Sequence, residues 1–246
     1  MSARFSEIVV DCVEPVALAR WWAETLGWEA VDGSEPGERM LRAPDDDGTI
    51  PALLFLPVAE TKDGKNRIHL DLASESLEEQ AAIVGGLVAR GATRVDIGQT
   101  GVPWVVLADP EGNEFCVLEP RAVYRGVGRL AGITMDAAEP IVNARFWAEA
   151  TGWSIGDQHD GAVTLVPPGR RAPDFVLVQV DEPKTVKLRW HLDVEPVGGA
   201  SVESEAQRLR ELGAVDVDIG QHDDPTTDWI VLADPAGNEL CVIPPL

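Results

Sequence analysis

The segment Leu107-Ala-Asp-Pro-Glu-Gly-Asn-Glu-Phe-Cys-Val117 returns later in the chain as Leu232-Ala-Asp-Pro-Ala-Gly-Asn-Glu-Leu-Cys-Val242. Nine of the eleven positions are identical at an offset of 125 residues. The repeat extends further, since Trp22-Ala-Glu-Thr-Leu-Gly-Trp28 returns from Trp147 at the same offset. The chain therefore contains two copies of one unit, and the fold has to be explained for one copy.

Each copy is long enough to form a domain with its own core. Solenoid repeats run at about 20–50 residues, well below the period of this chain. The stretch 120–129 contains two glycines and three arginines without apolar periodicity, which is typical of a linker. We predict domain 1 at residues 1–122, a linker at 123–128 and domain 2 at 129–246.

Composition and charge exclude some classes of partner. The formal charge of −22 repels nucleic acid and anionic membranes. The sequence has no apolar run of about 18 residues that would span a bilayer, and its N-terminus lacks the pattern of a signal peptide, so we expect a cytoplasmic protein. Three cysteines without a close pair indicate neither disulfides nor a thiolate zinc site, and we expect Cys116 and Cys241 to be buried thiols.

Secondary structure within the first copy follows from short apolar runs and helix signals. Pro15 in the first turn and Gly27 just past the end bound one helix over 16–26. A second helix is expected over 76–90. The β-branched and apolar runs predict strands at 7–12, 51–57, 68–72, 95–97, 104–107 and 114–118. Each copy is therefore expected to contain two βαβββ modules, which gives an α+β fold.

The chain resembles the vicinal oxygen chelate superfamily, which includes glyoxalases, bleomycin-resistance proteins and extradiol dioxygenases. The segments Leu26-Gly-Trp28, Lys65-Asn-Arg-Ile-His-Leu-Asp71 and Asp109-Pro-Glu-Gly-Asn-Glu-Phe-Cys116 carry the resemblance, and the last two together resemble its glyoxalase-like subgroup. The resemblance implies that paired modules form curved sheets around a cavity for a metal and a small substrate. We expect pairing within each copy, because the repeated unit is already two modules long. Four fused modules are compatible with a monomer or a homodimer.

The resemblance also implies metal ligands on the first and last strands of each module. Glu7, His69 and Glu114 match such positions in the first copy, where they are expected to hold one divalent ion such as Zn²⁺, Ni²⁺, Mn²⁺ or Fe²⁺. The second copy offers only His191 and Glu239, because Gly132 stands where Glu7 stands in the first. The first-strand histidine of an extradiol dioxygenase is missing, which disfavours dioxygenase chemistry.

Other interpretations of these residues stay open. Each histidine could hydrogen-bond to the glutamate of its own copy, Glu114 or Glu239, without any metal. Trp104 and Trp229 open strands and could line the mouth of a cavity, where an aromatic wall stacks on a flat ligand. Cys116 and Cys241 share strand faces with the two glutamates and join the predicted ligand-binding residues. The remaining motif residues are assigned structural or solvated places: Trp22 and Trp147 on the sheet, Asp109 and Asp234 in turns, and His159 and His222 in solvent.

Two functions are compatible with the sequence. In the first, the protein binds a small organic molecule in an internal cavity, as a resistance or sequestering protein would. In the second, it is a metal-dependent isomerase or lyase, in which Glu114 or Glu239 abstracts a proton next to a carbonyl, mainly in domain 1. The missing fourth ligand in Leu53-Leu-Phe-Leu56 favours binding.

Overall fold

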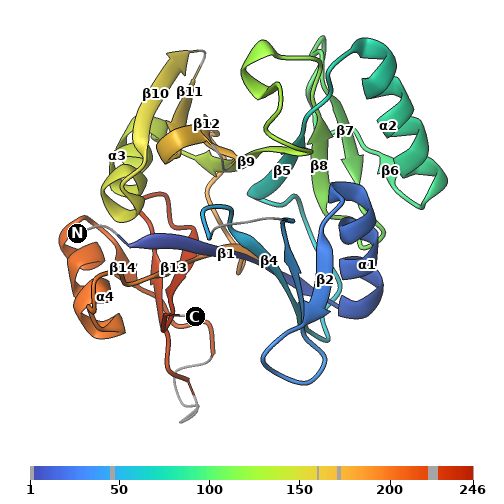
Figure 1. Ribbon diagram of the computed structural model, residues 1–246. Helices are drawn as coiled ribbons and strands as arrows, with labels where there is room; N and C mark the ends of the chain where they lie inside the picture. Colours follow the sequence, from blue (N-terminus) through green and yellow to red (C-terminus); the bar gives the residue numbers. More distant parts are fainter. Residues whose placement is uncertain (1–2, 45–47, 160, 171–172, 221–226, 246) are drawn as a thin grey trace.

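The computed structural model describes residues 3–44, 48–159, 161–170, 173–220 and 227–245, and it contains four βαβββ modules (Figure 1). Module 1 contains β1 (Arg4–Cys12), α1 (Pro15–Leu26), β2 (Glu29–Asp32), β3 (Arg39–Arg42) and β4 (Ala52–Pro57). Module 2 contains β5 (Ile68–Leu72), α2 (Leu77–Ala89), β6 (Thr93–Arg94), β7 (Val105–Ala108) and β8 (Glu114–Val117). Module 3 contains β9 (Leu130–Ala137), α3 (Pro140–Thr151), β10 (Ser154–His159), β11 (Ala162–Val166) and β12 (Asp174–Gln179). Module 4 contains β13 (Trp190–Glu195), α4 (Val202–Glu211), β14 (Val215–Asp216), β15 (Ile230–Ala233) and β16 (Glu239–Val242). Two short 3₁₀ helices, η1 (Ala122–Tyr124) and η2 (Pro168–Arg170), complete the elements, and the predicted α+β fold is confirmed.

The modules combine into two eight-stranded sheets that each draw on both copies. Sheet A has the order β14-β15-β16-β13-β1-β4-β3-β2 and joins module 1 to module 4. Sheet B has the order β10-β11-β12-β9-β5-β8-β7-β6 and joins module 2 to module 3. The joints are the antiparallel pairs β1 with β13 and β5 with β9. In Figure 1 sheet A occupies the lower half of the molecule and sheet B the upper half.

The expectation that modules pair within each copy is therefore wrong. All four modules present the edge of their first strand for pairing, so sequence repetition alone does not select a partner. Modules 1 and 2 instead pack through their helix-covered sides. The Trp22 ring lies edge-on to Phe115 of module 2 at 5.1 Å and to Trp190 of module 4 at 6.0 Å between ring centroids. The two modules of one copy thus belong to different sheets.

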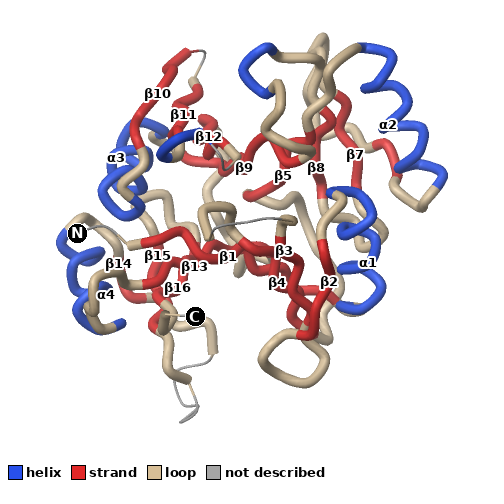
Figure 2. Tube along the Cα trace, in the orientation of Figure 1, coloured by secondary structure: helices blue, strands red, loops and turns tan. Residues whose placement is uncertain are grey.

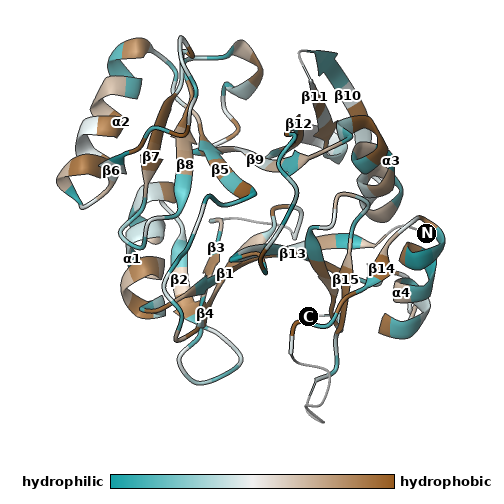
Figure 3. Ribbon diagram, turned by 180° about the vertical axis from the view of Figure 1, so that it is seen from behind, coloured by the Kyte–Doolittle hydropathy of each residue, from teal (hydrophilic) through white to brown (hydrophobic). Residues whose placement is uncertain are grey.

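A large hydrophobic core connects the two sheets. Its members include Trp22, Trp147 and Phe175, which are fully buried, and it draws on strands of both sheets. Figure 2 shows α1 and α3 at opposite flanks of the molecule, each beside strands of both sheets, and Figure 3 shows the hydrophobic residues that run along β7 and β15. The predicted packing of Trp22 and Trp147 between helix and sheet is confirmed, because both rings are inside this core.

Charged residues tie the copies together across the joints. Lys65 of copy 1 pairs with Asp136 of copy 2 at 2.5 Å, and its equivalent Lys187 pairs with Asp11 of copy 1. Arg67 donates to Asn238 Oδ1 at 2.9 Å. Arg189 pairs with Glu111 at 3.0 Å. The basic residues of the Lys-x-Arg segments are thus used for contacts between copies.

The two Asp-Pro turns are more than chain reversals. Asp109 accepts hydrogen bonds from the backbone N–H groups of Glu111 and Asn113, as a turn aspartate does. Its Oδ2 also accepts from Trp22 Nε1 at 3.1 Å, and Asp234 accepts from Trp147 Nε1 at 3.0 Å. Each turn therefore anchors the helix of a neighbouring module. Among the described residues, no helix has the length and apolar character needed to cross a membrane.

Candidate functional site

Each sheet has one face toward the shared core and one face turned away from it, which we call face A for sheet A and face B for sheet B. Side chains alternate along a strand, so core residues such as Ile8 and Val10 point inward while Glu7 and Val9 lie on face A. The cross-strand pairs Glu7 with Asp193 and Val9 with His191 put all four on the same face. Polar side chains of the central strands thus gather on the two outward faces.

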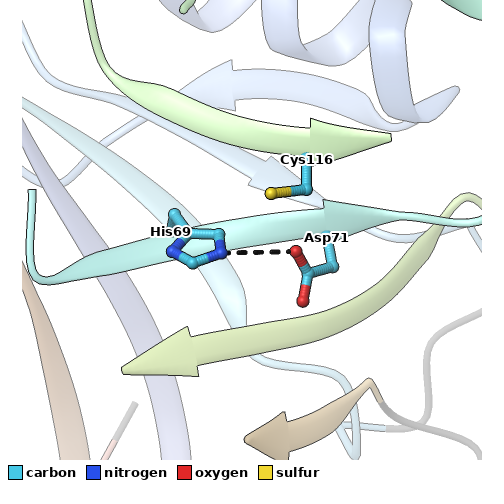
Figure 4. Close-up of side chains that lie close together, drawn as sticks. All are labelled: His69, Asp71 and Cys116. Carbon is cyan, nitrogen blue, oxygen red and sulfur yellow. Dashed lines mark ion pairs between the residues drawn. The ribbon is translucent and has the colours of Figure 1, made fainter. Parts of the chain in front are cut away.

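On face B, His69, Asp71 and Cys116 lie together (Figure 4). One potential ligand atom from each lies within 4.8 Å of the others. His69 Nε2 is 3.4 Å from Asp71 Oδ1, and Thr134 Oγ1 donates to Asp71 Oδ2 at 2.7 Å. Burial raises the pKa of the Cys116 thiol far above its ordinary value, with the Asp71 carboxylate adding to the effect. The thiol is therefore protonated, and the Asp71 carboxylate already has a hydrogen-bond donor.

Face A repeats this arrangement with His191, Asp193 and Cys241 and adds a second carboxyl group. His191 Nε2 is 3.4 Å from Asp193 Oδ1, and Glu7 is the cross-strand neighbour of Asp193. The Cys241 thiol hydrogen-bonds to the Asp193 carboxyl group. Among the described residues, no hydrogen bond reaches the buried atoms Glu7 Oε1 and Asp193 Oδ1 themselves. A buried polar atom without a partner costs about 1–3 kcal/mol of stability. A ligand that brings a hydrogen-bond donor or a cation to face A would remove this cost.

Burial dominates the electrostatics of face A. It raises the pKa of Glu7 to about 7, where Arg42 opposes and Glu38 and Glu195 add to the shift. It raises the pKa of Asp193 well above its ordinary value, with Glu7 adding to the effect, and lowers the pKa of His191 to about 3. The His191 contact with Asp193 is therefore a contact of a neutral imidazole rather than a charge pair. Burial and the proximity of the two carboxyl groups thus favour the protonated form of both.

The ligand set predicted for the first copy is not brought together. Glu7 lies in sheet A, whereas His69 and Glu114 lie in sheet B. Glu114 pairs with Lys62 at 2.9 Å and accepts from the Asn66 backbone N–H at 3.1 Å. Its equivalent Glu239 likewise binds Lys184 and the Leu188 backbone N–H. Because β1 pairs with β13, Glu7 lies on the same face as His191 rather than His69. Glu114 and Glu239 instead hold the segments that lead into β5 and β13.

The remaining predicted residues are distributed over both faces and the surface. Trp104 is half-buried on face B, where it packs near Cys116 and donates to Gln99 Oε1 at 2.9 Å. Trp229 is also half-buried, and Cys116 and Cys241 are buried free thiols, as predicted. His159 is exposed in β10, and His222 lies outside the described residues.

Two pockets lie away from these clusters. One of about 500 Å³ is bounded by α1, Lys62 and Glu111, and one of about 390 Å³ is bounded by the segments around Arg67 and Arg189. Neither is lined by His69 or His191. We place the candidate site on face A, because carboxyl oxygens without partners and three potential metal ligands gather there.

Comparison with known families agrees with the repeat and the module architecture. The model of a family described as "Glyoxalase-like domain" matches residues 7–118 and again residues 132–243. The chain belongs to this glyoxalase-like family. No curated protein matches the sequence.

Solved structures of other proteins have a fold similar to that of this chain. Glyoxalase I from Zea mays is 14% identical with a TM-score of 0.65, over 99% of this chain and 92% of that one. A putative dioxygenase from Bacillus subtilis is 15% identical with a TM-score of 0.61, over 99% of this chain and 85% of that one. At these identities the similarity concerns the fold, and the reaction has to be argued from the site.

Sequence reasoning missed one residue in each of the two clusters. Asp71 and Asp193 each follow a histidine by two positions, so alternation along the strand already places them on the histidine's face. That signal was present, but the resemblance directed the ligand assignment to Glu114 and Glu239 instead. Asp71 and Asp193 are the carboxylates that contact the imidazoles.

The raised pKa of Glu7 predicts a pH-dependent gain of stability in Glu7→Gln. The folded state binds the proton more tightly than the unfolded chain, whose value is 4.5. The protonated carboxyl therefore contributes full stability below about pH 4.5, and this contribution is lost as the pH rises through about 7. We expect Glu7→Gln to be more stable than wild type by up to about 3 kcal/mol at pH 8.5 and nearly equal at pH 4.5.

Urea denaturation of metal-free protein at both pH values measures this difference. The control is Glu29→Gln on exposed β2, which is expected to change stability little at either pH. Equal stability of Glu7→Gln and wild type at pH 8.5 would show that Glu7 is ordinarily ionised and solvated.

Proposed function

We propose that this glyoxalase-like chain binds a small organic molecule on face A, with Glu7, His191 and Asp193 as the recognising groups. The observation that carries the proposal is the pair of buried oxygens, Glu7 Oε1 and Asp193 Oδ1, without hydrogen-bond partners. A ligand that brings hydroxyl or amine donors satisfies them, which favours the complex over the free protein. Such recognition involves no covalent step and is sufficient for a sequestering or resistance protein.

Face B is the matched reference within the same molecule. Asp71 is the equivalent of Asp193, but its Oδ2 accepts a hydrogen bond from Thr134, and Gly132 stands at the position of Glu7. A Cβ on Gly132 would be 3.5 Å from Asp71 Oδ2, so a side chain here would lie beside that carboxylate as Glu7 lies beside Asp193. Face B thus has no carboxyl group at the position of Glu7, directly opposite Asp71. Its second buried carboxyl group, Asp174, lies one strand further away on β12, as the partner of Gly132.

Ligand-observed NMR with a library of small hydroxyl, amine and carbonyl compounds tests this proposal. We expect compounds with donor groups to bind wild type and Asp71→Ala, and to lose binding in Asp193→Ala and in Glu7→Ala. Retained folding is checked by amide spectra of each variant. Compounds that bind all three variants equally, or only fail with Asp71→Ala, would remove face A as the ligand site.

Metal-dependent enzymatic activity is the second candidate, and the chemistry of the donor set favours it on face A. An imidazole, a thiol and a carboxyl group within 4.8 Å, beside a further carboxyl group, match the ligands of Zn²⁺ and similar divalent ions. The residues that would hold the ion are His191, Asp193 and Cys241. When bound, such an ion supplies Lewis-acid stabilisation of a negatively charged oxygen. Glu7, with a pKa of about 7, is suited to accept a proton from a carbon next to a carbonyl.

Elemental mass spectrometry of protein purified without a metal-affinity tag separates the two functions. We expect the enzyme candidate to show about one equivalent of a transition metal that is lost in His191→Ala and retained in His69→Ala. Loss in His69→Ala alone would assign the ion to face B. Absence of metal after incubation with Zn²⁺, Ni²⁺ or Mn²⁺ would leave binding without metal as the function of face A.

A further inference from the structure

The pocket of about 390 Å³ lies where the two copies meet. Its lining comes mainly from segment 63–67 of copy 1, which leads into β5, and from segment 180–190 of copy 2, which ends at the first residue of β13. Basic side chains outnumber acidic ones in this lining by five to three, in a chain whose formal charge is −22. The basic members are Lys65, Arg67, Lys184, Lys187 and Arg189, and the acidic members are Asp63, Asp136 and Glu182. Basic groups thus gather in one pocket of an acidic protein.

Arg67 lines this pocket and makes its hydrogen bonds to uncharged groups. Its nitrogens donate to Asn238 Oδ1 at 2.9 Å and to the backbone oxygens of Glu182 at 2.9 Å and Asp136 at 3.1 Å. Each of the four other basic residues is ion-paired with a carboxylate, whereas no carboxylate is ion-paired with Arg67 among the described residues. A hydrogen bond between charged partners is about twice as strong as a neutral one. The positive charge of Arg67 is therefore available to a bound anion.

Two buried N–H groups of the lining have no acceptor within the part of the chain that the structure describes. They are Arg189 Nε and Trp190 Nε1, and the Trp190 residue is 1% exposed. In the other copy, the equivalent Arg67 Nε donates to Asn238 Oδ1. Ile68, whose side chain has no donor, stands at the position of Trp190 there. A buried donor without an acceptor destabilises the fold, so this pocket favours a ligand with acceptor oxygens.

The same pocket has an apolar part. Val180, Val186 and Leu188 line it from segment 180–190, and Ile97 lines it from copy 1. Leu188 is buried, whereas Val186 is 62% exposed and lies at the open side. A volume of about 390 Å³ is within the range of small-molecule sites and exceeds the size of a small inorganic anion. A ligand with an anionic group and a small apolar body matches these walls.

We propose that this pocket binds a small organic carboxylate. Its oxygens accept hydrogen bonds from Trp190 Nε1 and from the guanidinium groups of Arg67 and Arg189, and its apolar body contacts Val180 and Val186. The site does not rest on the proposed function, because it lies between the copies rather than on a sheet face and presents donors rather than carboxyl oxygens. Since its walls belong to both copies, the bound carboxylate also stabilises their association.

Titration of the metal-free full chain with benzoate, followed by ¹H–¹⁵N NMR spectra that include the tryptophan indole signals, tests the inference. We expect saturable binding that shifts the Trp190 Nε1–H signal, which is identified by its absence in Trp190→Phe. Benzyl alcohol has a similar size and no charge, and should bind at least about tenfold more weakly. Acetate keeps the carboxylate and lacks the ring, and should also bind at least about tenfold more weakly.

Two kinds of variant locate the binding in this pocket. Trp190→Phe keeps an aromatic ring and removes the donor, so we expect about tenfold weaker binding of benzoate with an otherwise native amide spectrum. Val186→Glu adds a negative charge at the open side of the pocket and should weaken binding by about threefold. Val215→Glu is the matched control, because Val215 is 59% exposed on β14 and does not line the pocket. It should bind benzoate as wild type does.

The inference would be overturned if benzoate bound no more tightly than benzyl alcohol or acetate, or if wild type and Trp190→Phe bound it equally. If Trp190→Phe does not fold, equal binding by Val186→Glu and Val215→Glu overturns it instead. Shifts centred on Glu7 and His191 would place the carboxylate on face A and would also contradict it. Glu7→Ala, which removes a recognising group of face A, should bind benzoate as wild type does. Failure of donor compounds on face A and failure of benzoate in this pocket are therefore separate outcomes.

Discussion

Residues 1–122 produced alone are expected to form a homodimer. The edges of β1 and β5 pair with β13 and β9 of the second copy in the intact chain, so both lose their partners when the copies are separated. An unpaired strand edge is a template for pairing with another chain. In a homodimer of residues 1–122, each molecule supplies the strand that the other lacks. The strand β1 of one molecule can pair with β5 of the other, in the way that it pairs with β13 in the intact chain. Light scattering coupled to size exclusion measures the mass.

Mixing the two halves provides the matched control. Residues 1–122 and 123–246 should associate into a one-to-one complex, since the native partners for both joints are then present. The amide spectrum of this complex should match that of the intact chain. If residues 1–122 instead form a folded monomer that does not bind residues 123–246, the two modules of one copy pair with each other in a sheet, which would contradict the prediction.

Asp109→Ala is expected to destabilise the fold by about 4 kcal/mol. The carboxylate is 3% exposed and accepts from Trp22 Nε1, from the Glu111 N–H and from the Asn113 N–H and side chain. Removing it leaves several buried donors unsatisfied, each at a cost of about 1–3 kcal/mol, which water recovers only in part. Urea denaturation of the variant and of wild type measures the change.

The repeat supplies a second instance and the surface supplies a control. Asp234→Ala removes the equivalent contacts to Trp147, Asn143 and the turn, and should destabilise by a similar amount. Within the part of the chain that the structure describes, the Asp96 side chain accepts only from the Gly98 N–H, in an exposed turn, so Asp96→Ala should change stability by less than about 1 kcal/mol. A small effect of Asp109→Ala, comparable with that of Asp96→Ala, would show that the two turns do not anchor the helices.

The sequence predicts well those elements that have a strong pattern of their own. The helix α1 begins at Pro15 and ends before Gly27, which adopts φ 72°, a conformation that glycine reaches without strain. Strand β5 matches its prediction, while β1 extends three residues further toward the N-terminus than predicted. These segments are bounded by helix signals or polar residues, so local chemistry is enough to locate them.

Elements without such a pattern were missed. Strand β2 (Glu29–Asp32) is exposed at all four positions and lies at the edge of sheet A, where hydrogen bonds to β3 rather than side-chain burial hold it. The short strand β6 occupies Thr93–Arg94 instead of the predicted 95–97. Neither is marked by apolar alternation, because neither buries a side chain.

The predicted metal-ligand set of Glu7, His69 and Glu114 was wrong for a different reason, which is the pairing of modules. The sequence placed Glu7 and His69 on first strands of modules, and the structure agrees for both. Which first strands lie side by side depends on tertiary contacts such as Arg67 with Asn238 and Trp22 with Phe115, which no local pattern reports. Because β1 pairs with β13 and not with β5, Glu7 lies beside the strand of His191 instead of the strand of His69.

The pairing of β1 with β13 is tested most directly by nuclear Overhauser effects between the copies. The chain is assembled by ligation with the first copy isotopically labelled and the second unlabelled, so that filtered spectra report only contacts between copies. Cross-strand effects are expected from Ile8 to Leu192 and from Val9 to His191, which are partners in the register of the sheet. Effects from β1 to β5 within the labelled copy, with none to β13, would contradict the cross-copy sheets and the composition of face A.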